Sequence, residues 1–397
     1  MKRNVFLPAI IATLAFVVSP LAFGDETFEV YRNIYHDSRS LQDKSAALRN
    51  LIALEDRGVA PILAEAFVDL LNSQKAYKES SEKALYCNTL RFVSASLGDY
   101  KYGDAAVFLW QAVEQIDDPL VRAECLMSLG KVHATDYAEK ISLLLRNLNM
   151  GPSVGGAEGG EKIAYASIIS LGDLKDIRGF SPVFFASQGW YSQRVRSQAL
   201  RSLKDITEDP TDVVQVILWE EDPVKKCLAL ELELASKAST ERKVASAVFG
   251  LSCGHAQYDA NQKTEAKDFS KLRKVALTGL IQLRGKSVEA VPLEYLSYVN
   301  GFDEEERILG LLALGVNGVD SAAVVISNLL MGLNTDVMGG VSDVVRNRMV
   351  KAAIEAAASS KNPIVRPALA SVQNNMKWSN SIIIAAKGAL DGFGSGK

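Results

Sequence analysis

Apolar residues recur every three or four positions through most of the chain, which is the spacing of amphipathic helices. In the segment that opens at Asp118, one apolar stripe consists of Val121, Cys125, Leu129 and Val132. The Asp118 carboxylate can accept hydrogen bonds from the first free amides, and the proline after it suits a first helical turn. A short polar turn and a second apolar stripe follow. This pattern predicts two helices joined by a short turn.

The dipeptide that opens this segment recurs in Asp222-Pro223 and, with Asn in place of Asp, in Asn362-Pro363. Helix pairs of this size cannot each bury a core alone, so they stack on their neighbours. The sequence thus predicts an all-α solenoid over residues 25–397, one domain built from roughly ten two-helix units of about 30 residues each. We place these units near 41–72, 82–116, 118–149, 161–188, 192–220, 222–253, 271–300, 304–332, 343–360 and 363–393.

Three segments without an apolar period are predicted to be loop insertions, near 150–160, 254–270 and 332–342. The first is rich in glycine. It follows a predicted helix and lacks the Lys-Ser/Thr ending that a phosphate-binding loop needs. Such loops can recognise a partner, and simple tolerated insertion is the alternative. The sequence leaves open whether the solenoid continues across 254–270.

These units resemble HEAT repeats, particularly the short, armadillo-like form related to phycobilin-lyase-type repeats. The resemblance rests on the run Asp118-Pro119-Leu120-Val121-Arg122, followed by a leucine-rich stretch that closes at Gly130. Several other units lack the proline. The resemblance implies a right-handed α–α superhelix that acts as a binding surface. It implies no lyase activity, because no catalytic motif accompanies the repeats.

The N-terminus has the order of a cleavable secretory signal. Basic residues at 2–3 precede an apolar run over 5–18, and small residues stand at Ala22 and Gly24. The apolar run is shorter than the roughly 20 residues that span a bilayer, although an uncleaved anchor is the alternative. We therefore expect residues 1–24 to be a signal peptide, with cleavage after Gly24 and a mature protein in the periplasm or outside the cell.

The charge balance excludes several kinds of partner. The formal net charge of the chain is −3, which gives no general attraction for nucleic acid or for anionic membrane surfaces. No later stretch is apolar over a membrane-spanning length, so we expect no membrane span in the mature chain. The chain has no Asn-x-Ser/Thr glycosylation site, which favours a bacterial origin.

The sequence contains no constellation typical of catalysis or metal binding. The three histidines, His36, His133 and His255, are far apart and lack zinc-ligand spacing. No Gly-x-Ser-x-Gly nucleophile motif occurs. Acidic runs at 220–222 and 303–306 precede predicted helices, where they meet the positive end of the helix dipole. We therefore expect a non-enzymatic protein without a cofactor or a metal.

The chain has four cysteines, which matter because the expected compartment is oxidising. Cys87, Cys125 and Cys227 lie in apolar helical stretches, where a small thiol packs well. Cys227 opens a first helix and Cys253 ends the paired second helix, so an antiparallel hairpin can bring the two together. Buried free thiols are the preferred interpretation, and a Cys227–Cys253 disulfide is the alternative.

Four aromatic residues are the candidate binding residues. Trp190, Tyr191 and Trp378 lie at expected junctions between units, and Trp219 ends an expected second helix. Aromatic side chains beside loops frequently anchor a partner protein. The alternative is that they wedge between adjacent repeats.

These patterns predict an exported scaffold or adaptor that binds another cell-envelope protein. The contacts would come from successive second helices on a concave surface, or from the loops between repeats. The alternative is a binding module or enzyme accessory subunit for a non-protein envelope ligand such as polysaccharide or peptidoglycan. Exposed aromatic rings would favour a saccharide, which stacks on them, and exposed aliphatic and charged side chains would favour a protein.

Overall fold

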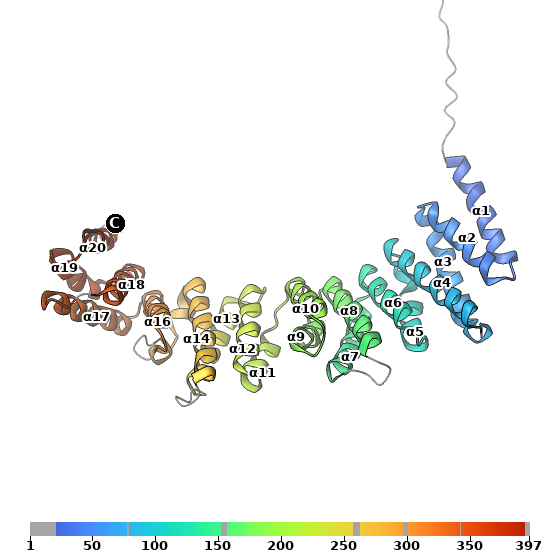
Figure 1. Ribbon diagram of the computed structural model, residues 1–397. Coiled ribbons are helices and arrows are strands. Elements are labelled where there is room, and N and C mark those ends of the chain that lie inside the picture. Colours follow the sequence, from blue (N-terminus) through green and yellow to red (C-terminus); the bar gives the residue numbers. More distant parts are fainter. Residues whose placement is uncertain are drawn as a thin grey trace, which may run out of the picture. The chain divides into compact units, whose positions relative to one another are not determined.

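The computed structural model describes residues 21–77, 79–151, 157–256, 263–296, 301–341 and 343–393. Over these ranges the protein is all-α, without a β-strand (Figure 1). It divides into two compact units, which are described separately. The first unit comprises residues 1–137 and 154–170, and the second comprises residues 138–153 and 171–397.

The first unit contains six α-helices and most of a seventh, α8, whose last residues belong to the second unit. These helices are α1 (Leu21–Asp37), α2 (Leu41–Ala53), α3 (Ala60–Asn72), α4 (Ser80–Asp99), α5 (Ala106–Gln115), α6 (Pro119–Lys131) and α8 (Ala157–Leu174). Four short 3-10 helices lie between them, namely η1 (Arg57–Val59), η2 (Gln74–Ala76), η3 (Gly103–Ala105) and η4 (Thr135–Tyr137).

The second unit contains the remaining helices. They are α7 (Ala138–Asn149), α9 (Phe180–Gln188), α10 (Gln193–Asp205), α11 (Thr211–Glu220), α12 (Pro223–Ala235), α13 (Thr240–Ala256), α14 (Lys263–Leu283), α15 (Lys286–Glu289), α16 (Glu304–Asn317), α17 (Asp320–Met338), α18 (Val344–Ser360), α19 (Arg366–Asn374) and α20 (Asn380–Gly392). Its 3-10 helices are η5 (Ile177–Gly179), η6 (Leu293–Leu296) and η7 (Pro363–Val365).

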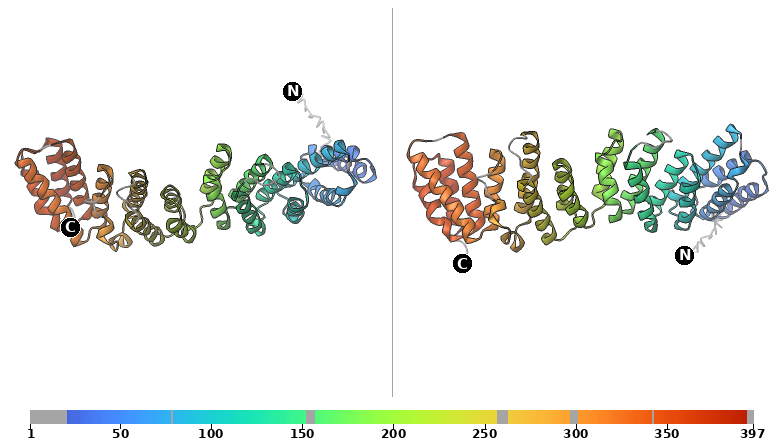
Figure 2. Two further views of the ribbon diagram at one scale, coloured as in Figure 1. Left: turned by 60° about the horizontal axis from the view of Figure 1, so that its bottom comes forward. Right: turned by 90° about the horizontal axis from the view of Figure 1, so that it is seen from below.

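Helices that are next but one in chain order pack on each other, which builds two layers in each unit (Figure 2). In the first unit α2 packs on α4 and α4 on α6, while α3 packs on α5. In the second unit one layer runs through α12, α14, α16, α18 and α20, and the other contains the contacts of α7 with α9, α11 with α13 and α17 with α19. In the first unit we call the helices of the layer with α4 first helices and those of the layer with α5 second helices. In the second unit the layer with α16 contains the first helices and the layer with α17 the second helices.

The predicted helix starts are confirmed at two of the three sites. Asp118 Oδ1 accepts hydrogen bonds from the amides of Leu120 and Val121, and Asp222 does the same at the start of α12. The third site differs, because Asn362-Pro363 opens η7 between α18 and α19 instead of a first helix. The predicted units 343–360 and 363–393 therefore become the pair α18 and α19, followed by α20.

Glycine permits first helices to approach closely at equivalent places. A methyl group at Gly98 on α4 would lie 2.8 Å from Ser128 Oγ on α6. In the same way, a methyl group at Gly172 on α8 would lie 2.7 Å from Ser202 Oγ on α10. Ser128 Oγ donates a hydrogen bond of 2.7 Å to the carbonyl of Ser94, which ties α6 to α4. The glycines near the ends of these helices thus set the spacing within the layer.

The turns from first to second helices share one backbone conformation. The first or second residue after the first helix has a positive φ of about the same size in each case, at Glu55, Lys101, His133, Lys175 and Lys361. In three of these turns the following Asp or Asn side chain then caps a 3-10 turn, as Asp56, Asp176 and Asn362 do. A left-handed residue reverses the chain at the helix end, and the Asx cap satisfies the amides that begin the next element.

The predicted bounds of the three loop insertions are largely wrong, because helices extend into each of these segments. α13 continues to Ala256 and α14 begins at Lys263, because Ala266 and Phe269 are buried on the helix. Likewise α17 continues to Met338, since Leu333, Asn334 and Val337 face its neighbours. The glycine-rich loop was predicted to run to residue 160, but α8 begins at Ala157. Residues 152–156, 257–262 and 342 lie outside the described ranges.

α1 was not foreseen as part of the fold. It packs on α2 and buries Tyr35, whose hydroxyl donates a hydrogen bond to Asp69. The predicted cleavage point after Gly24 lies within α1, and residues 1–20 of the predicted signal peptide lie outside the described ranges. The predicted mature chain would therefore begin inside this helix.

Candidate interaction surface

Three of the four candidate aromatic residues are buried or half-buried and donate hydrogen bonds within the chain. Tyr191 is buried and its hydroxyl lies 3.0 Å from Asn149 Oδ1, while Trp190 is half-buried and its indole N–H donates to the carbonyl of Leu148. The two rings pack on each other with centroids 4.4 Å apart. The expectation that Trp190 and Tyr191 anchor a partner is therefore corrected, because both lie against the end of α7.

Trp378 is also an internal residue, so its assignment as a binding residue is wrong. It is buried, and its Nε1 donates a hydrogen bond of 2.9 Å to Asn334 Oδ1 on α17. Asn375 donates to the same oxygen, and the Asn334 amide donates to Ser371. This network joins α17 to α19 and to the segment before α20.

Trp219 alone of the four is exposed, with 67% of its surface accessible. Its ring stacks on that of Phe249 on α13, with centroids 6.2 Å apart and planes within 9°. On α11, Val214, Ile217 and Leu218 face the core, which leaves Val216 and Trp219 on the outer face, three residues apart. The helical period of α11 therefore presents the indole to solvent.

Helices α11 and α13 hold Trp219 and Phe249 in register. Trp219 and Phe249 are separated by the same 30 residues as Asp212 and Arg242, which form an ion pair between the N-terminal ends of the two helices. Arg242 also lies 3.1 Å from Asp209. The surface thus has a charged pair at one end and stacked aromatic rings at the other. An apolar centre with a polar rim is the usual composition of a protein-binding surface.

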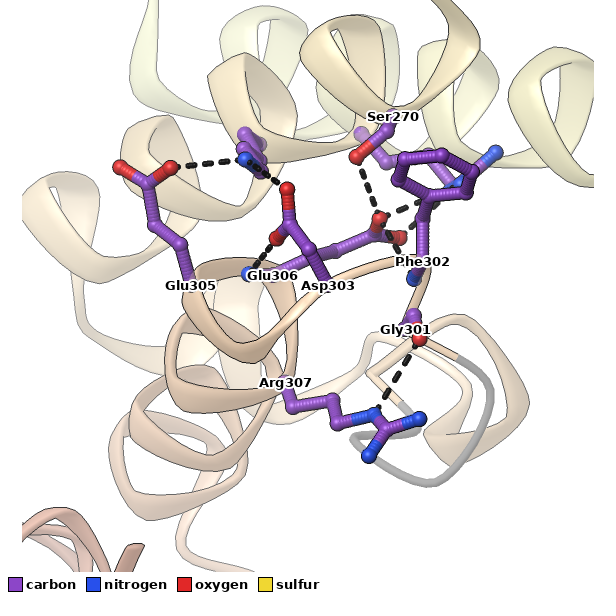
Figure 3. A network of polar contacts seen from close by, with 9 residues as sticks. Ser270, Gly301, Phe302, Asp303, Glu305, Glu306 and Arg307 are labelled. Carbon is purple, nitrogen blue, oxygen red and sulfur yellow. Dashed lines mark hydrogen bonds and ion pairs between the residues drawn. The ribbon is translucent and has the colours of Figure 1, made fainter. Parts of the chain in front are cut away.

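The most elaborate polar cluster in the second unit is internal, and Figure 3 shows it around Glu306. The Glu306 carboxylate accepts hydrogen bonds from Arg273 Nε at 2.6 Å and from Ser270 Oγ at 2.7 Å, both on α14. Arg273 Nη1 also donates to the carbonyl of Gly254 at the end of α13. Arg273 and Glu306 are each only 3% exposed, so the cluster joins helices and offers nothing to a ligand.

A second buried carboxyl, Glu233 on α12, has a raised pKa because burial disfavours its charged form. The hydroxyls of Thr211 and Ser246 partly offset this effect. Perturbed carboxyls often mark active sites. Glu233 is fully buried, however, and therefore cannot reach a substrate in this conformation.

Replacing Glu233 with glutamine is expected to stabilise the protein at pH 7 and to have little effect near pH 4. Because the folded pKa lies above the unfolded one, the stability linked to Glu233 is present below about pH 4 and is lost as the pH rises through the folded pKa. Urea unfolding at both pH values tests this. The control is Glu231→Gln, an exposed neighbour. An equal gain in stability at both pH values would contradict a raised pKa of Glu233.

The cysteines are free thiols in this structure, so the alternative of a Cys227–Cys253 disulfide is not realised in it. Burial raises the pKa of Cys125 and of Cys227 to about 12. A thiol with such a pKa is protonated at neutral pH and is a poor nucleophile. Among the described residues, no group of three or more His, Cys, Asp and Glu side chains is placed to hold a metal ion.

Comparison with known proteins identifies no family. No protein-family model matches the chain, and no curated protein matches it. Among solved structures, an engineered protein aligns with 94% of this chain and 100% of its own, at 15% sequence identity and a TM-score of 0.38. A likeness at this score supports no statement about fold or function.

Phe249 is the member of this surface that the sequence reasoning missed. It lies in the middle of an apolar helical stretch and lacks the junction position that singled out Trp219. A signal was nevertheless present. Adding one repeat length of 30 residues to Trp219 gives Phe249, and adding the same length to Asp212 gives Arg242.

Proposed function

We propose that this protein is an exported, non-catalytic scaffold of the HEAT-repeat kind that binds another cell-envelope protein. The observation that carries the proposal is the exposed Trp219 ring on α11, which stacks on the half-buried ring of Phe249 on the adjacent second helix α13. Tryptophan is enriched among the residues that dominate binding energy in protein interfaces. The right-handed superhelix of that family, its bacterial origin and its periplasmic location belong to the same proposal.

The composition of the second helices favours a protein over a saccharide. Among their described residues, the large apolar side chains that are exposed comprise a single aromatic, Trp219, and otherwise Val107, Leu143, Val216, Val324, Met331 and Met338. A saccharide-binding surface would need several rings for successive sugars to stack on. Aliphatic side chains and methionine instead suit the apolar side chains of a partner protein.

Replacing Trp219 with alanine is expected to weaken partner binding strongly while leaving the fold intact. The indole is exposed and packs against one other ring, so its loss removes little of the core. Truncation of a central aromatic anchor typically costs about 2 kcal/mol or more of binding energy, which corresponds to roughly a 30-fold loss of affinity. The matched control is Ile384→Ala on α20, which removes an equally exposed apolar side chain.

The measurement is photo-crosslinking in intact cells from a reactive residue at Val216, one turn from Trp219. We expect one envelope protein to be captured from this position, none from position 384, and none when Trp219→Ala is also present. Equal capture from both positions would contradict the proposal. Specific binding of purified peptidoglycan or polysaccharide, lost with Trp219→Ala, would instead support the alternative function.

A further inference from the structure

A second exposed surface lies on α17, separate from Trp219. Val324, Met331 and Met338 are exposed and follow one another at intervals of seven residues, so they form one stripe along the helix. The residues exposed between them, Asn328 and Thr335, are uncharged. Three apolar residues at this spacing line one face of the helix, and another helix can pack against such a line.

This stripe belongs to a helix that is docked in the fold. By length and composition α17 could cross a membrane. Its opposite face, however, is buried against α16, α18 and α19. Asn334 on that face is fully engaged with Ser371, Asn375 and Trp378. The exposed stripe is therefore the outer face of a core helix.

Gly332 lies beside the centre of the stripe without a packing reason in the chain itself. A methyl group at this position would meet no atom within 4 Å. Glycine in the middle of a helix costs about 1 kcal/mol relative to alanine. At Gly98 and Gly172 that cost accompanies a close helix contact, whereas at Gly332 the space is open. An open glycine on an apolar stripe allows the backbone of another helix to come near.

We propose that the α17 stripe pairs with the same stripe of a second copy of this chain, in an antiparallel arrangement centred on Met331. Such a two-fold contact places Val324 opposite Met338 of the copy, and Gly332 next to the central methionines. This arrangement also places the two helix dipoles antiparallel, so that the positive end of each lies beside the negative end of the other.

The charge pattern of α17 favours a second copy over other occupants. Asp320 and Asp336 are its only charged residues, and Asp336 pairs with Arg346. A stripe without charge has no ion pairs to offer a charged partner. It also has no Lys or Arg to meet anionic lipid, unlike helices that lie on membranes. Two identical neutral stripes meet without like-charge repulsion.

The exposed stripe is small, so we expect a weak association. The 15 residues from Val324 to Met338 span only about 21 Å of helix. The Val341 amide donates a hydrogen bond to the carbonyl of Asp336, and Val341, Val344 and Val345 are also exposed. A standard interface buries about 800 Å² on each partner, and a single helix face buries less. The pair should therefore dissociate in the micromolar range.

The test is sedimentation equilibrium of the mature chain across about 1–200 μM, a range that brackets a micromolar dissociation constant. The natural protein is expected to shift from monomer to dimer over this range. Met331→Glu should abolish the shift, and Ile384→Glu, at a more exposed apolar residue on α20, should leave it unchanged. A natural protein that stays monomeric throughout, or binds anionic vesicles through Met331 instead, would overturn the proposal.

Two further variants test the geometry. Gly332→Leu fills open space, so it should keep or raise the melting temperature while abolishing dimerisation. For orientation, Val324→Cys and Met338→Cys should form a disulfide with each other when the two proteins are mixed, and neither should do so alone. Crosslinking of each variant with itself would show a parallel pair and overturn the antiparallel arrangement.

Discussion

Replacement of Glu306 with alanine is expected to lower the free energy of unfolding by about 3–5 kcal/mol, as when one partner of a buried ion pair is removed. The Glu306 carboxylate is the acceptor for Arg273, for the Ser270 hydroxyl and for the amide of Phe302. Without it, a buried guanidinium loses its counter-charge and two donors lose their acceptor. Urea unfolding of the purified variant measures the effect.

An exposed ion pair provides the control for this prediction. Lys131 and Asp99 are equally close, at 2.7 Å, but both are substantially exposed, so Asp99→Ala should cost about 1 kcal/mol or less. Replacing both buried partners, with Arg273→Met and Glu306→Leu, should recover much of the stability because no charge is then left unpaired. A loss below about 1 kcal/mol for Glu306→Ala would show that the pair is not buried in solution.

Gly315→Ala is expected to destabilise the protein by about 3 kcal/mol, at the upper end of overpacking effects. A methyl group at Gly315 on α16 would lie 2.5 Å from both the Cα and the carbonyl oxygen of Ala356 on α18. Both contacts are with backbone, so no side-chain rotation relieves them and the helices must separate. Thermal and urea unfolding of the variant test the size of the loss.

Gly388→Ala on α20 is the matched control for Gly315→Ala. A methyl group there would meet no atom within 4 Å. Alanine should therefore raise the free energy of unfolding by about 1 kcal/mol through its higher helix propensity. If the two variants behaved alike, close packing of α16 on α18 would not be the cause of the loss.

The helices themselves could be predicted because their signals are local. In α6, the cap at Asp118 and the apolar stripe through Val121, Cys125 and Leu129 lie within one short segment, and the structure has both. The predicted break at 332–338 was wrong for the opposite reason. Its Gly332, Asn334 and Thr335 read as loop residues, but burial of Leu333 and Val337 against neighbouring helices extends α17 through them.

The candidate binding residues could be predicted only in part. Trp219 and Trp378 both stand out in the sequence, since Trp219 ends an expected second helix and Trp378 lies at an expected junction. Their environments differ because Asn334, 44 residues before Trp378, supplies a buried acceptor for its indole N–H. Trp219 instead meets the ring of Phe249 on α13. The difference in burial between the two tryptophans depends on a residue far away in the sequence, so no local sequence pattern predicts it.

The sequence by itself determined the helical class, the alternation of paired helices and the caps that begin them. These depend on spacings of three or four residues and on single Asp-Pro dipeptides. Only the tertiary structure decided which polar and aromatic side chains are internal. Glu306 meets Arg273, and Asn334 meets Trp378, although the residues of each pair are more than 30 positions apart in the sequence. The tertiary structure also leaves Trp219 and the α17 stripe exposed, because the burial of a helix face depends on which neighbouring helix covers it.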